Sequence, residues 1–177
     1  MTVRGTLLEN RVRVTDDWTA IYEDLYYGKK VDGDLELALV EAMHLVDRQE
    51  LVVERDGTEM DRDELYEFFT ARESEFPQKY ITYSDLRDRG YIVKSGFKFG
   101  AHFRVYPRGV NPYTEGPKDQ RQHTKWVVHA VTADEDFTFT DVSRAVRLAQ
   151  NIRAAMLWAV VDSEKEVTYY KVGHVTP

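Results

Sequence analysis

The sequence predicts an α+β protein made of two domains. Apolar residues at helical spacing occur in both halves of the chain, and the second half adds strand-like runs in the order β-β-β-α-β-β. A charged stretch, residues 72–75, precedes Pro77 and separates the halves. We therefore expect a small mixed α/β domain over residues 1–74, followed over residues 75–177 by a domain with a central mixed sheet flanked by helices.

Caps and turn residues define the elements of the first half. Aspartate side chains can accept hydrogen bonds from the free N–H groups of a first helical turn, and aspartates precede each apolar run of helical spacing. Strands are indicated by β-branched runs that end at turn signals. These patterns predict helices that begin near Asp16, Asp34 and Asp61, the first ending at Gly28, and strands over 12–15 and over 51–54, the latter ending at the turn Asp56-Gly57.

The second half is expected to begin with a helix and to continue as a sheet with one further helix. Tyr80, Tyr83 and Leu86 share one face of the first helix, which stops at Gly90 because glycine readily adopts the left-handed conformation of a helix end. A second helix, capped by Thr140 or Asp141, runs to about Ala155. Strands are expected over 91–94, 97–106, 124–131, 156–161 and 167–172.

The composition fits a cytoplasmic globular protein. The 177 residues include no cysteine, which excludes disulfides and thiolate metal sites and is typical of a reducing compartment. No apolar run approaches the length of a membrane span, and the first residues lack the apolar core of a signal peptide. We expect no membrane partner.

Charge is distributed unevenly along the chain. The net charge is −7, yet residues 79–130 contain ten Lys and Arg against four Asp and Glu, a local charge of +6 that leaves −13 on the remainder. A basic middle on an acidic body can bind phosphates on one face. An ordinary solvated surface explains the same pattern.

Tyr106 ends a run in which apolar and polar residues alternate strictly. Side chains of a strand point to opposite faces with period two, so Tyr106 shares its face with Lys98, His102 and Arg104. Nearby positive charge favours the anionic form of a phenol, which suits a general base. An ordinary cross-strand aromatic residue is the alternative.

A loop rich in Pro, Gly and basic residues, 107–122, separates Tyr106 from His123. Long loops in compact domains are often functional. His123 precedes a strand, and His102 and His129 compete with it as candidates for acid–base chemistry. The sequence contains no Gly-rich phosphate loop, nucleophile elbow or His-Glu-x-x-His motif, and its acids suggest no metal site.

The last helix is expected to present two faces. Its buried stripe comprises Val142, Ala145, Val146, Ala149 and Ile152. Arg144, Arg147, Asn151 and Ala154 fall on the other face. Such a face is usually only solvated, but two arginines can also receive RNA phosphates or stack on a base.

Two long motifs resemble a known family. Residues 87–100 (RDRGYIVKSGFKFG) continue into 103–106 (FRVY), and residues 144–153 read RAVRLAQNIR. Together with Tyr26-Tyr27-Gly28 and Gly33-Asp34-Leu35, they resemble the archaeal tRNA-splicing endonucleases over nearly the whole chain. The resemblance implies a nuclease-like C-terminal domain and a precursor tRNA substrate folded into a bulge–helix–bulge. It further implies a metal-independent, cofactor-free attack of the 2′-hydroxyl on the adjacent phosphate.

The resemblance also assigns roles to individual residues. The resemblance places the family's tyrosine, the general base, on Tyr106 and its histidine, the general acid, on His123. The lysine that stabilises charge on the phosphate should follow Arg153, where this sequence has Ala154. We interpret the alanine as a deliberate inactivating change, a natural degeneration, or a loss compensated by a cation such as Lys165 or Lys171.

RNA binding and assembly follow from the same resemblance. The family's base-stacking arginines match Arg147 and, less closely, Lys171. The acidic residues Asp162, Glu164 and Glu166 suit the loop that enters a basic cleft of another unit, with a solvated turn as the alternative. We expect a homotetramer or a complex with a second endonuclease subunit. Ala154 favours a second reading, a structural or RNA-binding subunit that does not cleave RNA.

Overall fold

The computed structural model describes residues 2–114 and 123–177. The chain divides into two compact units, Met1–Tyr80 and Ile81–Pro177, and the division falls within helix α4 (Phe76–Asp88). The boundary expected after residue 74 lies six residues earlier and stays a prediction. The second half of the loop predicted over 107–122 lies outside the described residues.

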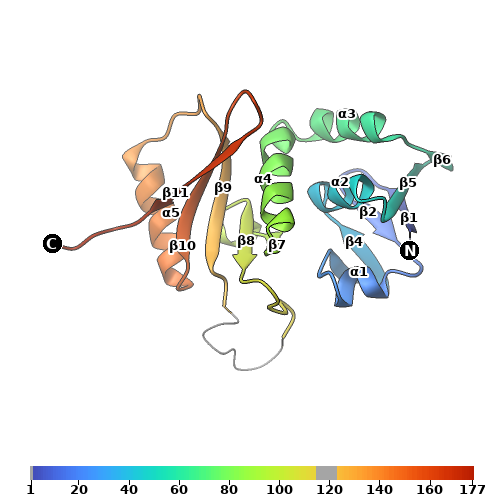
Figure 1. Ribbon diagram of the computed structural model, residues 1–177, viewed down its shortest axis with the longest axis horizontal. Helices are drawn as coiled ribbons and strands as arrows, with labels where there is room; N and C mark the ends of the chain where they lie inside the picture. Colours follow the sequence, from blue (N-terminus) through green and yellow to red (C-terminus); the bar gives the residue numbers. More distant parts are fainter. Residues whose placement is uncertain (1, 115–122) are drawn as a thin grey trace. The chain divides into compact units, whose positions relative to one another are not determined.

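The first unit is built on a six-stranded sheet in the order β3-β4-β2-β1-β5-β6. Strands β1 and β5 run parallel, and the other neighbours are antiparallel. The strands are β1 (Val3–Leu7), β2 (Val12–Val14), β3 (Lys29–Val31), β4 (Asp34–Leu37), β5 (Leu51–Arg55) and β6 (Thr58–Glu59). The helices are α1 (Thr19–Glu23), α2 (Leu39–Asp47) and α3 (Arg62–Arg72), drawn in blue to green in Figure 1.

Sequence predictions for this unit are confirmed where a cap or a tight turn decides the structure. The Asp61 carboxylate accepts hydrogen bonds from two N–H groups of the first turn of α3, as an N-cap should. Asp56 and Gly57 both have positive φ, at 52° and 80°, and connect β5 to β6.

Two helix predictions for this unit are wrong in extent. Residues 34–37 form β4, because Asp32 and Gly33 adopt positive φ of 51° and 92° and reverse the chain into a hairpin with β3. The helix expected over 16–28 shortens to α1, since Asp17 and Tyr26 have positive φ of 56° and 60°, which right-handed helix excludes.

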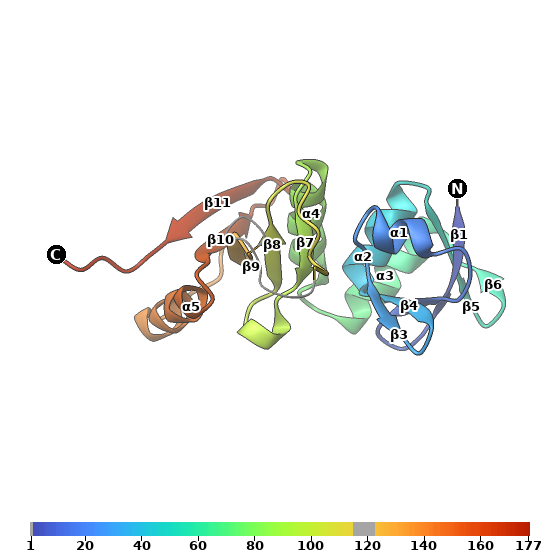
Figure 2. The same cartoon turned by 90° about the horizontal axis from the view of Figure 1, so that it is seen from below.

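The second unit is built on a five-stranded sheet in the order β11-β10-β9-β8-β7. Its strands are β7 (Ile92–Ser95), β8 (Phe103–Tyr106), β9 (Trp126–Thr132), β10 (Ala155–Val161) and β11 (Val167–Val172). Only β9 and β10 are parallel among these pairs, and α5 (Phe139–Asn151) connects them. The predicted order β-β-β-α-β-β is confirmed, as is the α+β class (Figures 1 and 2).

Helices cover both faces of this sheet. The predicted stripe of α5 packs against Val127, Val131, Met156 and Trp158 on one face. Phe103 pairs with Val128, and therefore lies on the other face, where its ring is 5.8 Å from that of Tyr83 in α4. The two helices accordingly lie on either side of the strands in Figure 1.

The strand predicted over 97–106 is wrong in its first part. Residues Phe97–Phe99 form a 3-10 turn, and β8 begins at Phe103. Gly96 and Gly100 explain the difference: a Cβ at Gly96 would lie 2.9 Å from backbone atoms of Ala101 and Phe103, and Gly100 has φ of +62°. Glycine at both positions allows the chain to fold back where the alternating pattern predicted a continuous strand.

Helix α5 begins two to three residues earlier than predicted. Thr138 is the N-cap, and its side chain accepts a hydrogen bond from the backbone N–H of Asp141 at 3.2 Å. The Thr138 hydroxyl donates in turn to the Asp141 carboxylate and holds the pKa of that carboxyl below its ordinary value. Asp141 is therefore the third residue of a capping box rather than the cap itself.

Candidate active site

Tyr106 is the last residue of β8, and its side chain is only 3% exposed. The guanidinium carbon of Arg104, two residues earlier on the same strand, lies 5.8 Å from the centre of the Tyr106 ring. The predicted proximity to Arg104 is thus confirmed. Lys98 instead belongs to the 3-10 turn, and His102 precedes β8, so the prediction that both share a strand face with Tyr106 is wrong.

Backbone hydrogen bonds of Lys125 join three strand ends at one rim of the sheet. Its N–H donates to the carbonyl of Val105 at 2.8 Å, and its carbonyl accepts from the N–H of Ala155 at 3.2 Å. Tyr106 and Ala154 adjoin these two partners in the chain. The structure therefore brings Tyr106 and Ala154 to the same rim, on either side of the start of β9.

His123 is half-buried and lies two residues before Lys125, so it adjoins the same rim. Its rivals are elsewhere in the sheet. His102 precedes β8, at the end of that strand opposite Tyr106, and its Nδ1 accepts a hydrogen bond from the N–H of Ala130 at 2.9 Å. The His129 ring packs 5.4 Å from Trp158 in the middle of the sheet. The register pairs Val105 with Trp126 and Phe103 with Val128, so the end of the ladder that holds Tyr106 is also the end that His123 precedes in the chain.

Ala154 lies in a short turn between α5 and β10. Arg153 has φ of 58°, a left-handed conformation, and the N–H of Ala154 donates to the carbonyl of Ala149 at 2.9 Å. This helix-ending turn directs the chain into β10 at Ala155. The methyl group of Ala154 is half-buried at the rim and supplies no charge.

Lys165 and Lys171 lie at opposite ends of the strands beside Ala154. Lys165 is in the hairpin after Val161, and six strand residues at about 3.3 Å each put it about 20 Å from the rim. Lys171 pairs with Leu157, close to the start of β10. Within one subunit, Lys171 rather than Lys165 is therefore positioned near Ala154.

Arg147 lies on the outward face of α5, as predicted. It lines an open groove together with Phe139, Thr140, Ser143 and Arg144. Sequence reasoning missed Phe139, whose side chain is 95% exposed at the start of the helix. Its spacing of eight residues from Arg147, two helical turns, is the signal that would have placed it on the same face.

The acidic residues of the β10–β11 hairpin are all exposed. The Asp162 carboxylate accepts hydrogen bonds from the N–H groups of Glu164 and Glu166 at 2.9 and 3.0 Å. Asp162 thereby shapes the turn, and the side chains of Glu164 and Glu166 extend from it into solvent.

Within residues 2–114 and 123–177, no group of three or more His, Cys, Asp and Glu side chains is arranged to hold a metal ion. In the same residues, no helix has the length and apolar character needed to cross a membrane.

Both halves of the chain match a known protein family. Residues 76–169 match the family described as tRNA intron endonuclease, catalytic C-terminal domain, and residues 3–66 match the corresponding N-terminal domain. The chain belongs to the tRNA intron endonuclease family. The resemblance seen in its two motifs is confirmed.

Relatives within the tRNA intron endonuclease family are archaeal tRNA-splicing endonucleases. The chain is 40% identical to that of Thermococcus onnurineus over 155 residues, which are 88% of this chain and 85% of the relative. It is 34% identical to that of Methanothermobacter thermautotrophicus over the full length of both proteins. The relative from Methanosarcina mazei is 41% identical over 97% of this chain, but the chain spans only 48% of that relative.

Proposed function

We propose that this chain is a subunit of a tRNA-splicing endonuclease that cleaves precursor tRNA at bulge–helix–bulge intron junctions. The observation that carries the proposal is the rim of the second unit. Lys125 ties the ends of β8, β9 and β10 together, and it does so where Tyr106, His123 and Ala154 adjoin these strands. Family membership supports the RNA substrate and the reaction class.

In the proposed reaction Tyr106, as the phenolate, takes the proton of a ribose 2′-hydroxyl. The 2′-oxygen attacks the adjacent phosphorus, and the bond from phosphorus to the 5′-oxygen breaks. His123, as the imidazolium, donates its proton to that leaving oxygen. The products are a 2′,3′-cyclic phosphate and a 5′-hydroxyl, and water is not consumed, so the cleavage is of the lyase type. Both proton transfers use side chains, and the scheme requires no metal or cofactor.

Ala154 leaves the transition state of the proposed reaction without a positive charge beside the phosphate. Negative charge develops on the non-bridging oxygens of the phosphate as the 2′-oxygen attacks. A lysine ammonium at position 154 would stabilise this charge, and loss of one such stabiliser costs about 10²–10³ in rate. We therefore expect the chain as it stands to bind RNA and to cleave it slowly.

Ala154 also favours a second candidate function, a structural or RNA-binding subunit that does not cleave RNA. In that role the chain would pair with a second, catalytic endonuclease subunit. The exposed Glu164 and Glu166 support an association through the β10–β11 hairpin, with a second copy or with such a subunit.

Single-turnover cleavage of a bulge–helix–bulge RNA, with chelator present, tests the proposal. Ala154→Lys should raise the rate about 10²–10³-fold, and products should carry cyclic-phosphate ends. Ala154→Met is the matched control, because it adds a side chain of similar length without charge, and it should leave the rate low. If Ala154→Lys binds RNA but remains inactive, alone and with an active relative as partner, the chain is the non-cleaving subunit.

A further inference from the structure

Four side chains form an aromatic–cation cluster between α4 and the start of β9. The rings of Tyr91 and Trp126 meet edge-on, with centroids 5.1 Å apart. The Arg108 guanidinium carbon lies 5.0 Å from the Tyr91 ring centre, and the Lys125 ammonium lies 5.5 Å from it and 4.2 Å from that of Trp126. Both rings are half-buried, and both cations are exposed.

The cluster adjoins the rim that carries the proposed active site. Arg108 follows Tyr106 by two residues, and Lys125 follows His123 by two residues. The Lys125 backbone is itself the link between Val105 and Ala155. Both cations therefore lie within two residues of the proposed acid–base pair, at the same rim of the sheet.

Arg108 is held in place by the end of α4. Its Nε donates to the carbonyl of Arg89 at 2.6 Å. The arginine stem passes beside Gly90, whose φ of +86° suits a residue without a side chain. The guanidinium is therefore oriented before any ligand arrives, which lowers the entropy cost of binding.

Within residues 2–114 and 123–177, no carboxylate neutralises the charges of the cluster. In the part of the chain that the structure describes, neither Arg108 nor Lys125 forms an ion pair with a carboxylate. Nearby Arg89 differs, because its guanidinium donates to both oxygens of Asp85, at 2.8 and 3.1 Å. Two exposed cations beside two aromatic rings form the combination that binds single-stranded nucleic acid.

We propose that the aromatic–cation cluster is an RNA-contact site for an unpaired nucleotide that flanks the cleaved phosphodiester. Arg108 and Lys125 bind its phosphate, and an unstacked base packs against the Tyr91 and Trp126 rings. The inference rests on the proposed function, since it takes RNA as the ligand. It adds a contact that does not involve Arg147 or Lys171.

Binding measured at several salt concentrations tests the phosphate contact and the base contact separately. The probes are a bulge–helix–bulge RNA and a fully paired duplex of equal length, and the full chain is used. Arg108→Gln and Lys125→Gln should each reduce the slope of log affinity against log salt concentration by about 0.7. Tyr91→Leu should weaken binding of the bulged probe about tenfold and leave the duplex unaffected.

Matched variants separate binding from folding. Tyr91→Phe keeps an aromatic ring and should retain binding, and Lys29→Gln, the same charge change on exposed β3, should leave the slope unchanged. If Arg108→Gln and Lys125→Gln lower thermal stability while slope and affinity are unchanged, the cluster is structural and the inference is wrong. If the unsubstituted chain does not distinguish bulged RNA from duplex, the proposed function fails first, and this site with it.

Discussion

The Tyr169 hydroxyl donates a hydrogen bond of 2.7 Å to the Asp85 carboxylate, across 84 residues of sequence. The bond joins β11, at the edge of the sheet, to α4. Asp85 also accepts two hydrogen bonds from Arg89. Burial of the Tyr169 phenol, reinforced by Asp85, raises the pKa of Tyr169 well above its usual value.

The raised pKa of Tyr169 predicts a loss of stability in alkali. A group whose pKa is higher in the folded state stabilises the fold fully below its unfolded pKa, about 10 for tyrosine, and this stabilisation declines as the pH rises further. The free energy of unfolding should therefore fall between pH 9.5 and 12 by about 1 kcal/mol or more relative to Tyr169→Phe. Urea unfolding at a series of pH values measures it.

Tyr170→Phe is the control for that measurement, because Tyr170 is the next residue and its ring is exposed. Its pH profile should follow that of the unsubstituted chain. Identical alkaline profiles for Tyr169→Phe and the unsubstituted chain would show that the bond to Asp85 does not control the titration of Tyr169.

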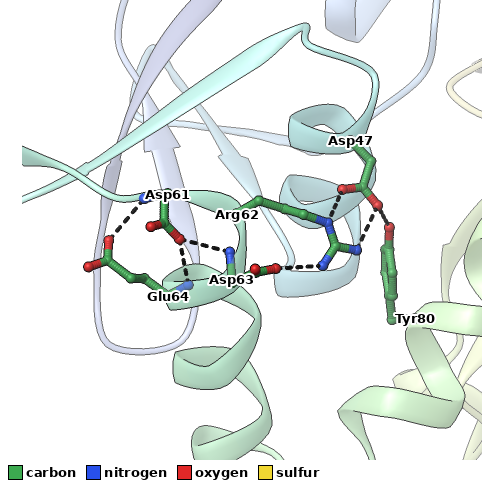
Figure 3. A network of polar contacts seen from close by, with 6 residues as sticks. All are labelled: Asp47, Asp61, Arg62, Asp63, Glu64 and Tyr80. Carbon is green, nitrogen blue, oxygen red and sulfur yellow. Dashed lines mark hydrogen bonds and ion pairs between the residues drawn. The ribbon is translucent and has the colours of Figure 1, made fainter.

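A second prediction concerns Asp47 in the first unit. Arg62 donates to Asp47 through Nε at 2.9 Å, and the Tyr80 hydroxyl bonds to the same carboxylate (Figure 3). The bond to Asp47 raises the pKa of Arg62. Since the pair is half-exposed, Asp47→Ala should lower the free energy of unfolding by only about 1 kcal/mol, most of it from the lost partner of Tyr80.

Denaturant titration in low and high salt separates the two contributions at Asp47. The ionic part of the stability loss should shrink at 1 M salt, because the Debye length there is only about 3 Å. The part due to the hydrogen bond of Tyr80 should remain. Glu67→Ala, an exposed change on α3, the helix of Arg62, should have an effect within about 0.5 kcal/mol of zero. A loss equal to that of Glu67→Ala would mean that Asp47 adds nothing to stability.

Gly96 should tolerate no side chain. Its absent Cβ would meet three backbone atoms at 2.9 Å, so Gly96→Ala must displace the chain before β8. We expect a loss of more than about 2 kcal/mol in unfolding free energy. Gly173→Ala is the comparison, because nothing lies within 4 Å of a Cβ there, and its stability should not change. Equal melting temperatures for the two variants would contradict the expected clash.

The three histidines should differ in function once a lysine is present at position 154. In an Ala154→Lys background, His123→Ala should reduce single-turnover cleavage at least 10²-fold, because the leaving oxygen loses its acid. His102→Gln and His129→Gln should change the rate only a few-fold, since neither adjoins the rim. A large loss of cleavage rate with either glutamine variant, in a protein that remains folded, would mean that the general acid is not His123.

Local signals predicted the elements that local chemistry controls. The strand 167–172, the Asp61 cap and the Asp56-Gly57 turn follow from neighbouring residues, and each matches the structure. The continuous strand expected over 97–106 failed because contacts at Gly96 override an alternating pattern. Period two describes which face a residue would take in a strand, but it carries no information about where the strand begins.

The candidate site depended on a different kind of information. The family motifs marked Tyr106, His123 and Ala154, but no local pattern relates positions so far apart in sequence. These three residues lie at one rim because β8 pairs with β9 and β9 pairs with β10, and both pairings are long-range contacts. The cluster around Tyr91 was missed for the same reason, since its four members come from three separate segments.

The β8–β9 ladder has a consequence for how the chain can change in length. Tyr106 and His123 are connected by sixteen residues, yet the spacing of the strand ends beside them is set by the hydrogen bond from Lys125 to Val105. Residues can therefore be added to or removed from the connecting segment without altering that spacing. The turn from α5 to β10 has no such freedom, because one deleted residue would pull position 154 away from the strand ends. Insertions and deletions should thus be tolerated between β8 and β9 and excluded between α5 and β10.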